Sequence, residues 1–331
     1  MQKPDICKYA LESNILKRWH YLSYHFSFYL TGETHAFVEA LFDALLGVDR
    51  VAPGYAKTMI DRIASIGGRE KHDADYEQLL QLFAEIHVVA HLASEYRAAG
   101  YRIEIEPGAS KGLPNPEITI ESDTWILAVE VKAPALLQLR SKRRDMDIQL
   151  LGRFDDNIRD LLTPIDHTVM LPRDNTIRDF LSSANHKFEV LPVPEDKTRY
   201  NLLVIVWDDA IQEAVAALLS PESGLLTKQS FAKDADDCFI KYGSTHAVIL
   251  IRHLHQLVNA MGDENLFDEA LHAFDYGSYD SFPWKALIAN PFVENKCPPE
   301  IVGAMQATAI EGLQLAAEYI PLDVIRWGYV D

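Results

Sequence analysis

The stretch Leu113–Pro134 reads LPNPEITIESDTWILAVEVKAP and contains two β-patterned runs separated by a turn. Successive side chains of a strand point to opposite faces of a sheet, so residues i and i+2 share a face. In the second run, one face carries Ile126, Ala128, Glu130 and Lys132, and the other carries Trp125, Leu127, Val129 and Val131. Glu130 and Lys132 therefore continue a face that is otherwise apolar.

The charged residues of this stretch suggest a metal site. A buried acid and a buried amine are costly unless something pairs with them. A second acid, Glu117, opens the first run and can approach Glu130 if the two runs pair as strands. Two close carboxylates resist joint ionisation unless a cation lies between them. The pattern thus points to a divalent-metal site with Lys132 as a positioned ammonium.

Pro116-Glu117 followed by Glu130-Val131-Lys132 resembles the signature of the PD-(D/E)XK nuclease superfamily, which has the restriction-endonuclease-like fold. The family pattern is Pro-Asp, a spacer of one strand-turn-strand, then (Asp/Glu)-x-Lys. Here Glu117 stands where the family usually has Asp. The resemblance covers about residues 75–255 through pattern rather than identity. It implies an α/β fold with an αβββαβ core around a mixed central sheet, and helical N- and C-terminal flanks.

The residues before the quoted stretch predict a long helix and a strand, which is the family's core order. Apolar residues recur at helical spacing through Asp75–Ala99, Gly100 ends the helix, and Tyr101–Pro107 alternates as a strand does. Glu85 lies within the apolar stripe of that helix. The resemblance implies that Glu85 lies beside the metal site. A helix-edge glutamate that reaches water is the open alternative.

The residues after the quoted stretch also follow the family's order. Asp174–Phe188 has the spacing of an amphipathic helix, Asn201–Trp207 is typical of a buried parallel strand, and His246–Ile251 predicts a further strand. Lys187, near the end of that helix, could face the site or the substrate. A solvated helix terminus is the alternative interpretation.

Three regions are expected along the chain. Residues 1–70 form a helical N-terminal region, with helices at Leu11–Leu30 and Glu33–Leu46. Residues 71–261 form the nuclease-like core, with an insertion at about 133–173. Residues 262–331 form a mostly helical, acidic C-terminal region, with helices at Asn265–Phe274 and Pro299–Tyr319 and a loop between them.

The net charge of −18 is unusual for a protein that binds a polyanion. Residues 1–70 are neutral overall, and residues 262–331 carry −9. One basic run, Arg140, Lys142, Arg143 and Arg144, follows the Glu-Val-Lys motif. It could bind the phosphate backbone of the substrate, or it could be a solvated loop. The acidity favours a nuclease that needs a protein partner or a homo-oligomer to hold nucleic acid.

Other motifs narrow the class of protein. Three distant cysteines argue against a disulfide framework, and the N-terminus has no signal-peptide pattern. No apolar run approaches the ~20 residues of a membrane span, so we expect a cytoplasmic protein without a membrane partner. Gly-x-Ser-x-Gly, phosphate-binding loop and Cys-x-x-Cys motifs do not occur. His87 and His91, four apart on the long helix and followed by Glu95, leave a zinc-dependent hydrolase as a weaker alternative.

The resemblance implies a Mg2+- or Mn2+-dependent nuclease that hydrolyses phosphodiester bonds, with DNA favoured over RNA, in restriction, phage defence or repair. In that mechanism Glu117, Glu130 and the Val131 carbonyl hold the metal, because hard oxygen ligands suit it. Lys132 acts on the attacking water or on the transition state, and Glu85 assists at the metal. The rival hypothesis is a catalytically inactive, nuclease-like subunit for interaction or assembly.

Overall fold

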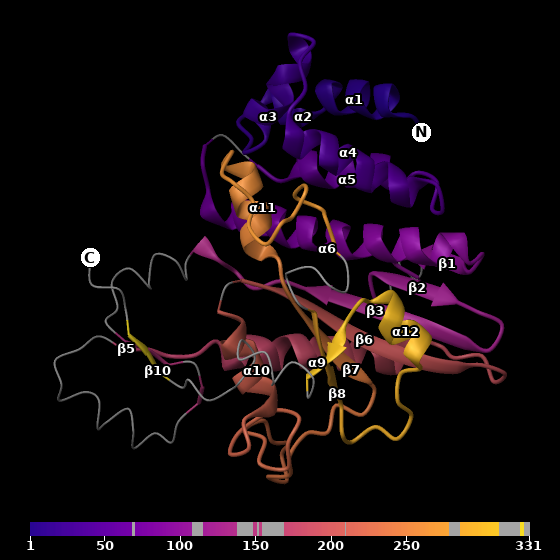
Figure 1. Ribbon diagram of the computed structural model, residues 1–331, viewed down its shortest axis with the longest axis vertical. Helices are drawn as coiled ribbons and strands as arrows, with labels where there is room; N and C mark the ends of the chain where they lie inside the picture. Colours follow the sequence, from indigo (N-terminus) through magenta and orange to yellow (C-terminus); the bar gives the residue numbers. More distant parts are fainter. Residues whose placement is uncertain are drawn as a thin grey trace.

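In a computed structural model of the chain, the described residues are 1–67, 70–107, 115–137, 148–150, 152–153, 169–208, 210–277, 285–310 and 325–327. They form an α/β structure around a mixed sheet of seven strands, in the order β1-β2-β3-β6-β7-β8-β9 (Figure 1). The strands are β1 (Arg102–Ile105), β2 (Ile118–Glu121), β3 (Trp125–Lys132), β6 (Thr198–Trp207), β7 (Ala247–Arg252), β8 (Lys285–Ala289) and β9 (Thr308–Ala309).

The sheet changes from antiparallel to parallel at β3. β1, β2 and β3 pair as an antiparallel meander, whereas β3, β6 and β7 are parallel neighbours. The parallel pairs require crossovers, which include α9 (Asp174–Val190) before β6 and α10 (Ile211–Leu219) before β7. β8 then runs antiparallel to β7, and β9 runs parallel to β8. A separate small sheet has the order β10-β4-β5, from β4 (Ile148–Leu150), β5 (Val169–Met170) and β10 (Ile325–Trp327).

Helices cover both faces of the large sheet, and the alternation of β3 matches these two faces. α6 (Asp73–Ala98) and the helices beyond it cover one face, and α9 and α10 cover the other (Figure 1). Trp125, Leu127, Val129 and Val131 pack into the core on the α6 side, and Ala128 packs into the core on the α9 side. Glu130 and Lys132 share the face of Ala128, as the two-residue period predicts.

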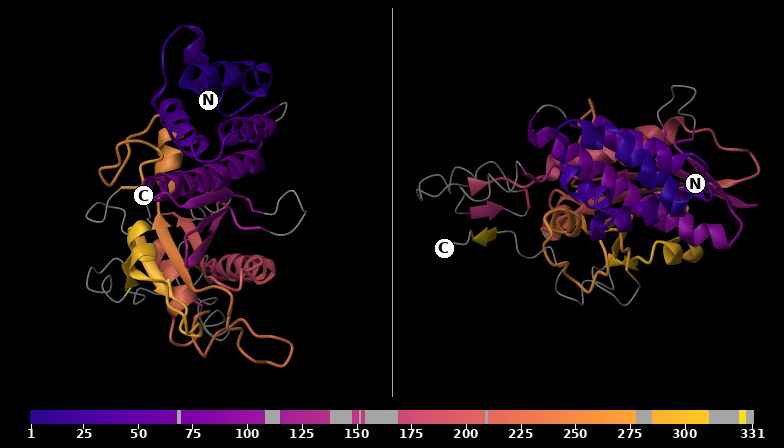
Figure 2. Two further views of the ribbon diagram at one scale, coloured as in Figure 1. Left: turned by 90° about the vertical axis from the view of Figure 1, so that its right-hand side faces the viewer. Right: turned by 90° about the horizontal axis from the view of Figure 1, so that it is seen from above.

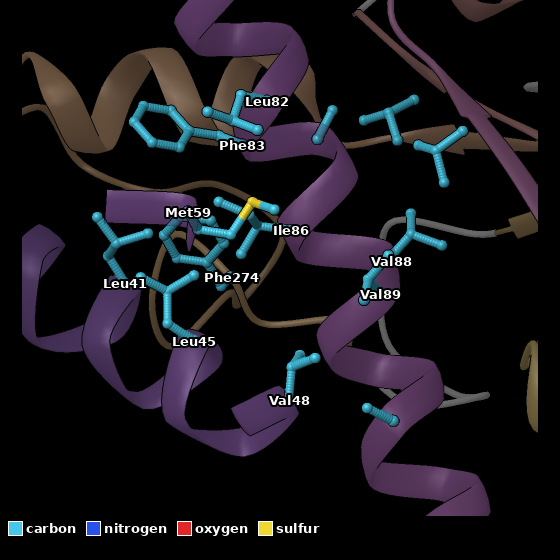
Figure 3. Packing of buried hydrophobic residues seen from close by; sticks show 14 of the residues in the cluster. Leu41, Leu45, Val48, Met59, Leu82, Phe83, Ile86, Val88, Val89 and Phe274 are labelled. Carbon is cyan, nitrogen blue, oxygen red and sulfur yellow. The ribbon is translucent and has the colours of Figure 1, made fainter. Parts of the chain in front are cut away.

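The N-terminal helices pack on α6 and extend its core. They are α1 (Lys3–Glu12), α2 (Asn14–Lys17), α3 (Ser23–Ser27), the 3₁₀ turn η1 (Phe28–Leu30), α4 (Ala36–Asp49) and α5 (Tyr55–Ser65). Figure 3 shows Leu41 and Leu45 of α4 and Met59 of α5 against Phe83 and Ile86 of α6. α6 therefore lies between these helices and the sheet (Figure 2). The predicted boundary near residue 70 does not separate two cores, because one hydrophobic cluster spans it.

The expected helix at Leu11–Leu30 is wrong. Two short helices, α2 and α3, and the 3₁₀ turn η1 occupy this segment together with the end of α1. Ser13 interrupts the helix, because its Oγ accepts the Ile15 N–H at 3.2 Å and caps α2. Arg18 then adopts an extended backbone and ends α2.

The described residues of the C-terminal region are not mostly helical, contrary to expectation. Residues Asn265–Phe274 form turns rather than a helix, and β8 lies within the segment expected to be a loop. The described part of the helix expected at Pro299–Tyr319 contains α12 (Pro299–Ala304) and then β9, and residues 311–319 lie outside the described residues. Pairing with β7 explains the difference, since β8 adds to an existing sheet edge. α11 (Leu254–Met261) was not foreseen. None of the described helices is both long enough and apolar enough to cross a membrane.

Candidate functional site

Three glutamates lie side by side across the first three strands. Glu106 and Glu117 each lie one residue beyond the paired residues Ile105 and Ile118, and Glu130 follows Val129, the β3 partner of Ile118. The Glu106 N–H donates to the Glu117 carbonyl at 2.9 Å, and the Glu117 N–H donates to the Val129 carbonyl at 3.0 Å. Glu106 has a φ of 47°, in the left-handed region that few non-glycine residues adopt, and it ends β1.

A fourth glutamate joins this row from helix α6. Single carboxylate oxygens of Glu85, Glu106 and Glu117 lie within 4.8 Å of one another. Glu85 is only 9% exposed, because it occupies the apolar stripe that packs α6 on the sheet. Three carboxylates at this spacing repel one another unless cations or protons compensate. We call Glu85, Glu106, Glu117 and Glu130, with the cations that contact them, the acidic cluster.

Arg62 of α5 supplies the first of these cations. Its guanidinium forms a two-pronged ion pair with Glu85, with Nη1–Oε1 at 2.9 Å and Nη2–Oε2 at 3.1 Å. The same Nη1 donates to Glu106 Oε1 at 3.1 Å. Arg62 comes from the N-terminal helical region, which is outside the part of the chain that resembles the nuclease family. One residue of that region therefore belongs to the site.

Two lysines hold the buried end of the row. Glu130 is fully buried, and its Oε1 accepts from Lys132 Nζ at 2.7 Å and from Lys187 Nζ at 2.6 Å. Lys187 Nζ also lies 3.9 Å from Glu117 Oε1 and so bridges the two acids. Glu130 Oε2 is buried and has no hydrogen-bond partner in the described part of the chain. An unsatisfied buried carboxylate oxygen is costly and favours a cation or a proton beside it.

The crowding of carboxylates shifts their ionisation. The pKa of Glu117 is raised to about 8, first by burial and then by the nearby charges of Glu85 and Glu130, while Lys187 and Lys132 oppose the shift. Burial also raises the pKa of Glu85, although Arg62 opposes this and Glu106 and Glu130 add to it. The metal-free site therefore holds a proton on Glu117 near neutral pH. A cation that binds here must replace that proton.

A cleft of about 560 Å³ opens beside these residues, past the carboxyl end of β3. Glu85, Glu117, Val131 and Lys132 line it, whereas Glu130 lies behind them. The remaining lining comes from α5, α6 and α9 and includes Arg62, Ser65, Gln78, Gln81, Asp179, Phe180 and Ser183. Apolar side chains, Ile66, Leu82, Val131, Ala133 and Phe180, share the walls with these polar and charged ones, and the charged ones can contact a charged ligand.

The Val131 carbonyl points toward the same site. Carbonyls two residues apart on a strand point to the same side, and the Val129 carbonyl accepts from Glu117 of β2. The Val131 carbonyl therefore points toward the chain that precedes β2. Pro116 lies there and has no N–H to donate. This leaves a backbone oxygen beside the carboxylates, as the sequence analysis expected of a metal ligand.

The structure brings together most of the residues singled out from the sequence. Glu85, Glu117, Glu130, Val131, Lys132 and Lys187 share one site. The basic run Arg140, Lys142, Arg143 and Arg144 lies outside the described residues. Sequence reasoning missed Glu106 and Arg62. The alternation of Tyr101–Pro107, counted in register with the next strand, could have found Glu106, whereas nothing local distinguishes Arg62.

The histidines do not form the alternative zinc site in the described residues. His87 stacks on His253 with ring centroids 3.9 Å apart, and His91 stacks on Tyr276 at 3.5 Å. His91 Nε2 also hydrogen-bonds the Ala304 carbonyl at 2.7 Å. Burial lowers the pKa of both His91 and His253 to about 4. These side chains are neutral packing partners within the core, and Glu95 is exposed.

Comparison of the chain with protein-family models, with curated proteins and with solved structures found no match.

Proposed function

We propose that this protein is a metal-dependent nuclease with a restriction-endonuclease-like core, which hydrolyses phosphodiester bonds with Mg2+ or Mn2+. The observation that carries this proposal is the row of Glu106, Glu117 and Glu130 across β1, β2 and β3, with Glu85 above it and Lys132 two residues beyond Glu130. The order α6-β1-β2-β3-α9-β6 supports it, because it is like the αβββαβ core of the family, with β4 and β5 of the small sheet inserted between β3 and α9.

The residues of the site fit a hard divalent cation. Carboxylate oxygens are the ligands that Mg2+ prefers, and Glu85, Glu106 and Glu117 offer three of them within 4.8 Å of one another. Glu130 offers a buried oxygen that has no other partner among the described residues. In the proposed site Glu85, Glu106, Glu117, Glu130 and the Val131 carbonyl would hold the metal. The bound metal would supply an acidified water and neutralise charge on the phosphate.

The lysines of the site would act on the substrate and on its developing charge. Lys132 lines the cleft, and Glu130 holds its ammonium at 2.7 Å. A cation fixed in this way needs little rearrangement when negative charge develops on a phosphate oxygen. Lys187 is held by the same Glu130 oxygen from the opposite side, on α9. In this proposal Glu130 therefore positions both ammonium groups as well as binding the metal.

The substrate class follows from charge and from the fold. A cleft lined by Arg62 and Lys132 beside a bound metal would suit an anionic phosphodiester, and the likeness of element order to DNA-cleaving enzymes favours DNA over RNA. The net charge of −18 opposes long-range attraction of a polyanion. We therefore propose that a protein partner or a second copy of the chain contributes to substrate binding. Restriction, phage defence and repair are the pathways in which such a nuclease would act.

The rival proposal is a catalytically inactive subunit that uses the same fold for assembly. The ion pairs of the acidic cluster favour it, because Arg62, Lys132 and Lys187 already compensate three of the four carboxylates without a metal. Glu117 favours the nuclease, because no cation in the described residues lies closer to its carboxylate than Lys187 at 3.9 Å.

One assay separates the two proposals. Supercoiled plasmid, single-stranded DNA and RNA are incubated with the protein in Mg2+, in Mn2+ and in chelator. The nuclease proposal expects metal-dependent cleavage that Lys132→Ala abolishes. Equal residual activity in the wild type and in Lys132→Ala would point to a contaminant. Lack of cleavage with every metal and substrate would favour the assembly subunit.

A further inference from the structure

Arg62 occupies the carboxylates that the proposed metal needs. Its two terminal nitrogens engage both oxygens of Glu85, and one of them also engages Glu106. Two of the three closely spaced carboxylates are therefore already bound to a cation in the metal-free protein. A guanidinium and a divalent cation repel each other and compete for the same lone pairs. Metal binding at Glu85 and Glu106 thus requires Arg62 to give up at least part of this contact.

The Arg62 side chain can turn away from Glu85 toward solvent. Its side chain is 40% exposed, whereas that of Glu85 is 12% exposed, so the guanidinium lies on the solvent side of the pair. It lines the cleft together with Ser65, Gln78 and Gln81, which are neutral. The other two cations of the cluster, Lys132 and Lys187, are held at a different acid, Glu130. Arg62 is therefore the cation of the cluster that a metal at Glu85 and Glu106 would release.

A guanidinium released beside the cleft could bind the phosphate of a phosphodiester. The planar fork of arginine binds two oxygens of one phosphate, as it binds the two oxygens of Glu85 here. We propose that Arg62 is a substrate-positioning residue, which leaves Glu85 and Glu106 when a divalent cation binds and then contacts a phosphate of the nucleic acid. This inference rests on the nuclease function proposed above. It adds that the N-terminal helices contribute directly to substrate binding.

The exchange couples the two ligands of the site. If the metal frees Arg62 for the phosphate, nucleic acid must in turn strengthen metal binding by the same factor. Before the metal binds, Arg62 neutralises the buried Glu85 and keeps the empty cluster from repelling its own residues. The residue therefore has two successive partners, and its removal should affect the two binding steps in opposite directions.

The test uses the full chain and measures binding rather than activity. Arg62→Gln keeps an amide that can donate to Glu85 but removes the charge. The affinity for Mn2+ alone is measured by calorimetry in wild type and variant. The affinity for a fluorescent DNA duplex at saturating Mn2+ is measured by anisotropy, in a Lys132→Ala background so that the DNA stays intact. Circular dichroism and thermal unfolding confirm that each variant is folded.

We expect Arg62→Gln to bind Mn2+ about tenfold more tightly and DNA about tenfold more weakly, within the usual range of coupling between sites. Arg62→Lys keeps the charge without the fork and should fall between. Lys57→Gln is the matched control, because Lys57 lies on the same helix with its ammonium over the Tyr9 ring at 4.9 Å, and it should change neither affinity.

Two results would overturn the inference. If Arg62→Gln weakens both affinities, or changes neither, Arg62 only holds α5 on the core. If the wild type binds no Mn2+, the inference and the proposed nuclease function fail together. Tight Mn2+ binding by the wild type with an unchanged Arg62→Gln variant removes the inference and leaves the proposed function standing.

Discussion

The acidic cluster differs from a second group of buried charges, which lies at the end of β6. In this second group, the arginine cluster, Arg173 Nη2 lies 3.0 Å from Asp208 Oδ1 and 2.6 Å from Glu213 Oε2. Its guanidinium also lies over the Trp207 ring, 4.2 Å from the centroid. The three charged side chains are between 0% and 10% exposed, and they do not line the cleft of the acidic cluster.

In the arginine cluster each carboxylate accepts hydrogen bonds from N–H donors, whereas in the acidic cluster the Glu117 carboxylate lies close to other carboxylates. Asp208 accepts from Arg173 and from the Ala210 N–H, and Glu213 accepts from both the side chain and the backbone of Arg173. Glu117 instead has Glu106 and Glu85 within 4.8 Å and its nearest ammonium at 3.9 Å. Burial of charge is thus common to both groups. Crowding of like charges beside a cleft is what distinguishes a candidate site from a structural ion pair.

The largest expected effect is the loss of folding stability when the arginine cluster is disrupted. Arg173→Ala leaves Asp208 and Glu213 buried without their cation, which typically costs about 3–5 kcal/mol. We expect the free energy of unfolding from urea denaturation to fall by that amount. Arg178→Ala on the same helix α9 is the control, because its pair with Asp179 is exposed and such pairs contribute up to about 1 kcal/mol. A loss as small as that of the control would mean that the two clusters do not differ in this way.

Substitutions in the acidic cluster should lower the rate of cleavage and leave the free energy of unfolding nearly unchanged. Glu130→Ala removes a ligand of the proposed metal, and Lys132→Ala removes the cation beside the reacting phosphate. Each should lower the cleavage rate by on the order of 10²–10³. Lys132 and Lys187 are 24% and 23% exposed, so both ammonium groups can turn to water when Glu130 is removed.

The free energy of unfolding of Glu130→Ala and of Lys132→Ala should therefore change little, because each substitution also removes a buried charge. Lys233→Ala, whose ammonium pairs with exposed Asp237 in a distant loop, should keep full activity. Cleavage is followed on plasmid gels and stability by thermal unfolding. Unfolding of Glu130→Ala at ambient temperature would show that the acidic cluster is a structural ion pair like the arginine cluster.

The pH dependence of stability should expose the crowded carboxylates. The pKa of Glu117 is about 8 in the folded chain, above the ordinary value of 4.5, so the folded state binds more protons between these two values. Stability conferred by the proton is complete below pH 4.5 and is lost as pH rises toward 8. We expect a loss of about 2 kcal/mol across this window in metal-free protein, less than the shift alone implies because neighbouring acids share the repulsion.

Glu117→Gln tests this origin, because the amide cannot ionise. Urea denaturation at pH 5 and pH 8, in chelator, should show a flatter profile in the variant than in the wild type. A steeper profile in the variant would place the titrating group elsewhere.

The smallest expected effect concerns Glu106, which is 36% exposed at the side chain and lies at the solvent edge of the row. Glu106→Gln removes one of the four proposed carboxylate ligands and should weaken Mn2+ binding about tenfold, or about 1.4 kcal/mol. Glu104→Gln on the same strand is the control, since Glu104 is exposed and is not one of the closely spaced acids. Equal Mn2+ affinities of the two variants would remove Glu106 from the site.

Local periodicity in the sequence was enough to place part of the site. The two-residue period of Trp125–Lys132 places Glu130 and Lys132 on one face, and the helical stripe of α6 buries Glu85. These side chains are oriented by the backbone of their own element. The same reasoning predicted α6, β3, α9, β6 and β7 within a few residues of their bounds.

The contacts between charged side chains of different elements followed from the packing of those elements and could not be read from local periodicity. Glu106 joins the cluster because β1 pairs with β2, and Arg62 joins because α4 and α5 pack on α6. Lys187 reaches Glu130 although the sequence left a solvated helix end as an alternative. Residues 11–30 form several short helices instead of the one expected helix, and residues expected to be a loop form β8. In both segments, packing and strand pairing outweighed the local preference of the sequence. Contacts between distant residues depend on how elements dock, and the period of a single element holds no information about that.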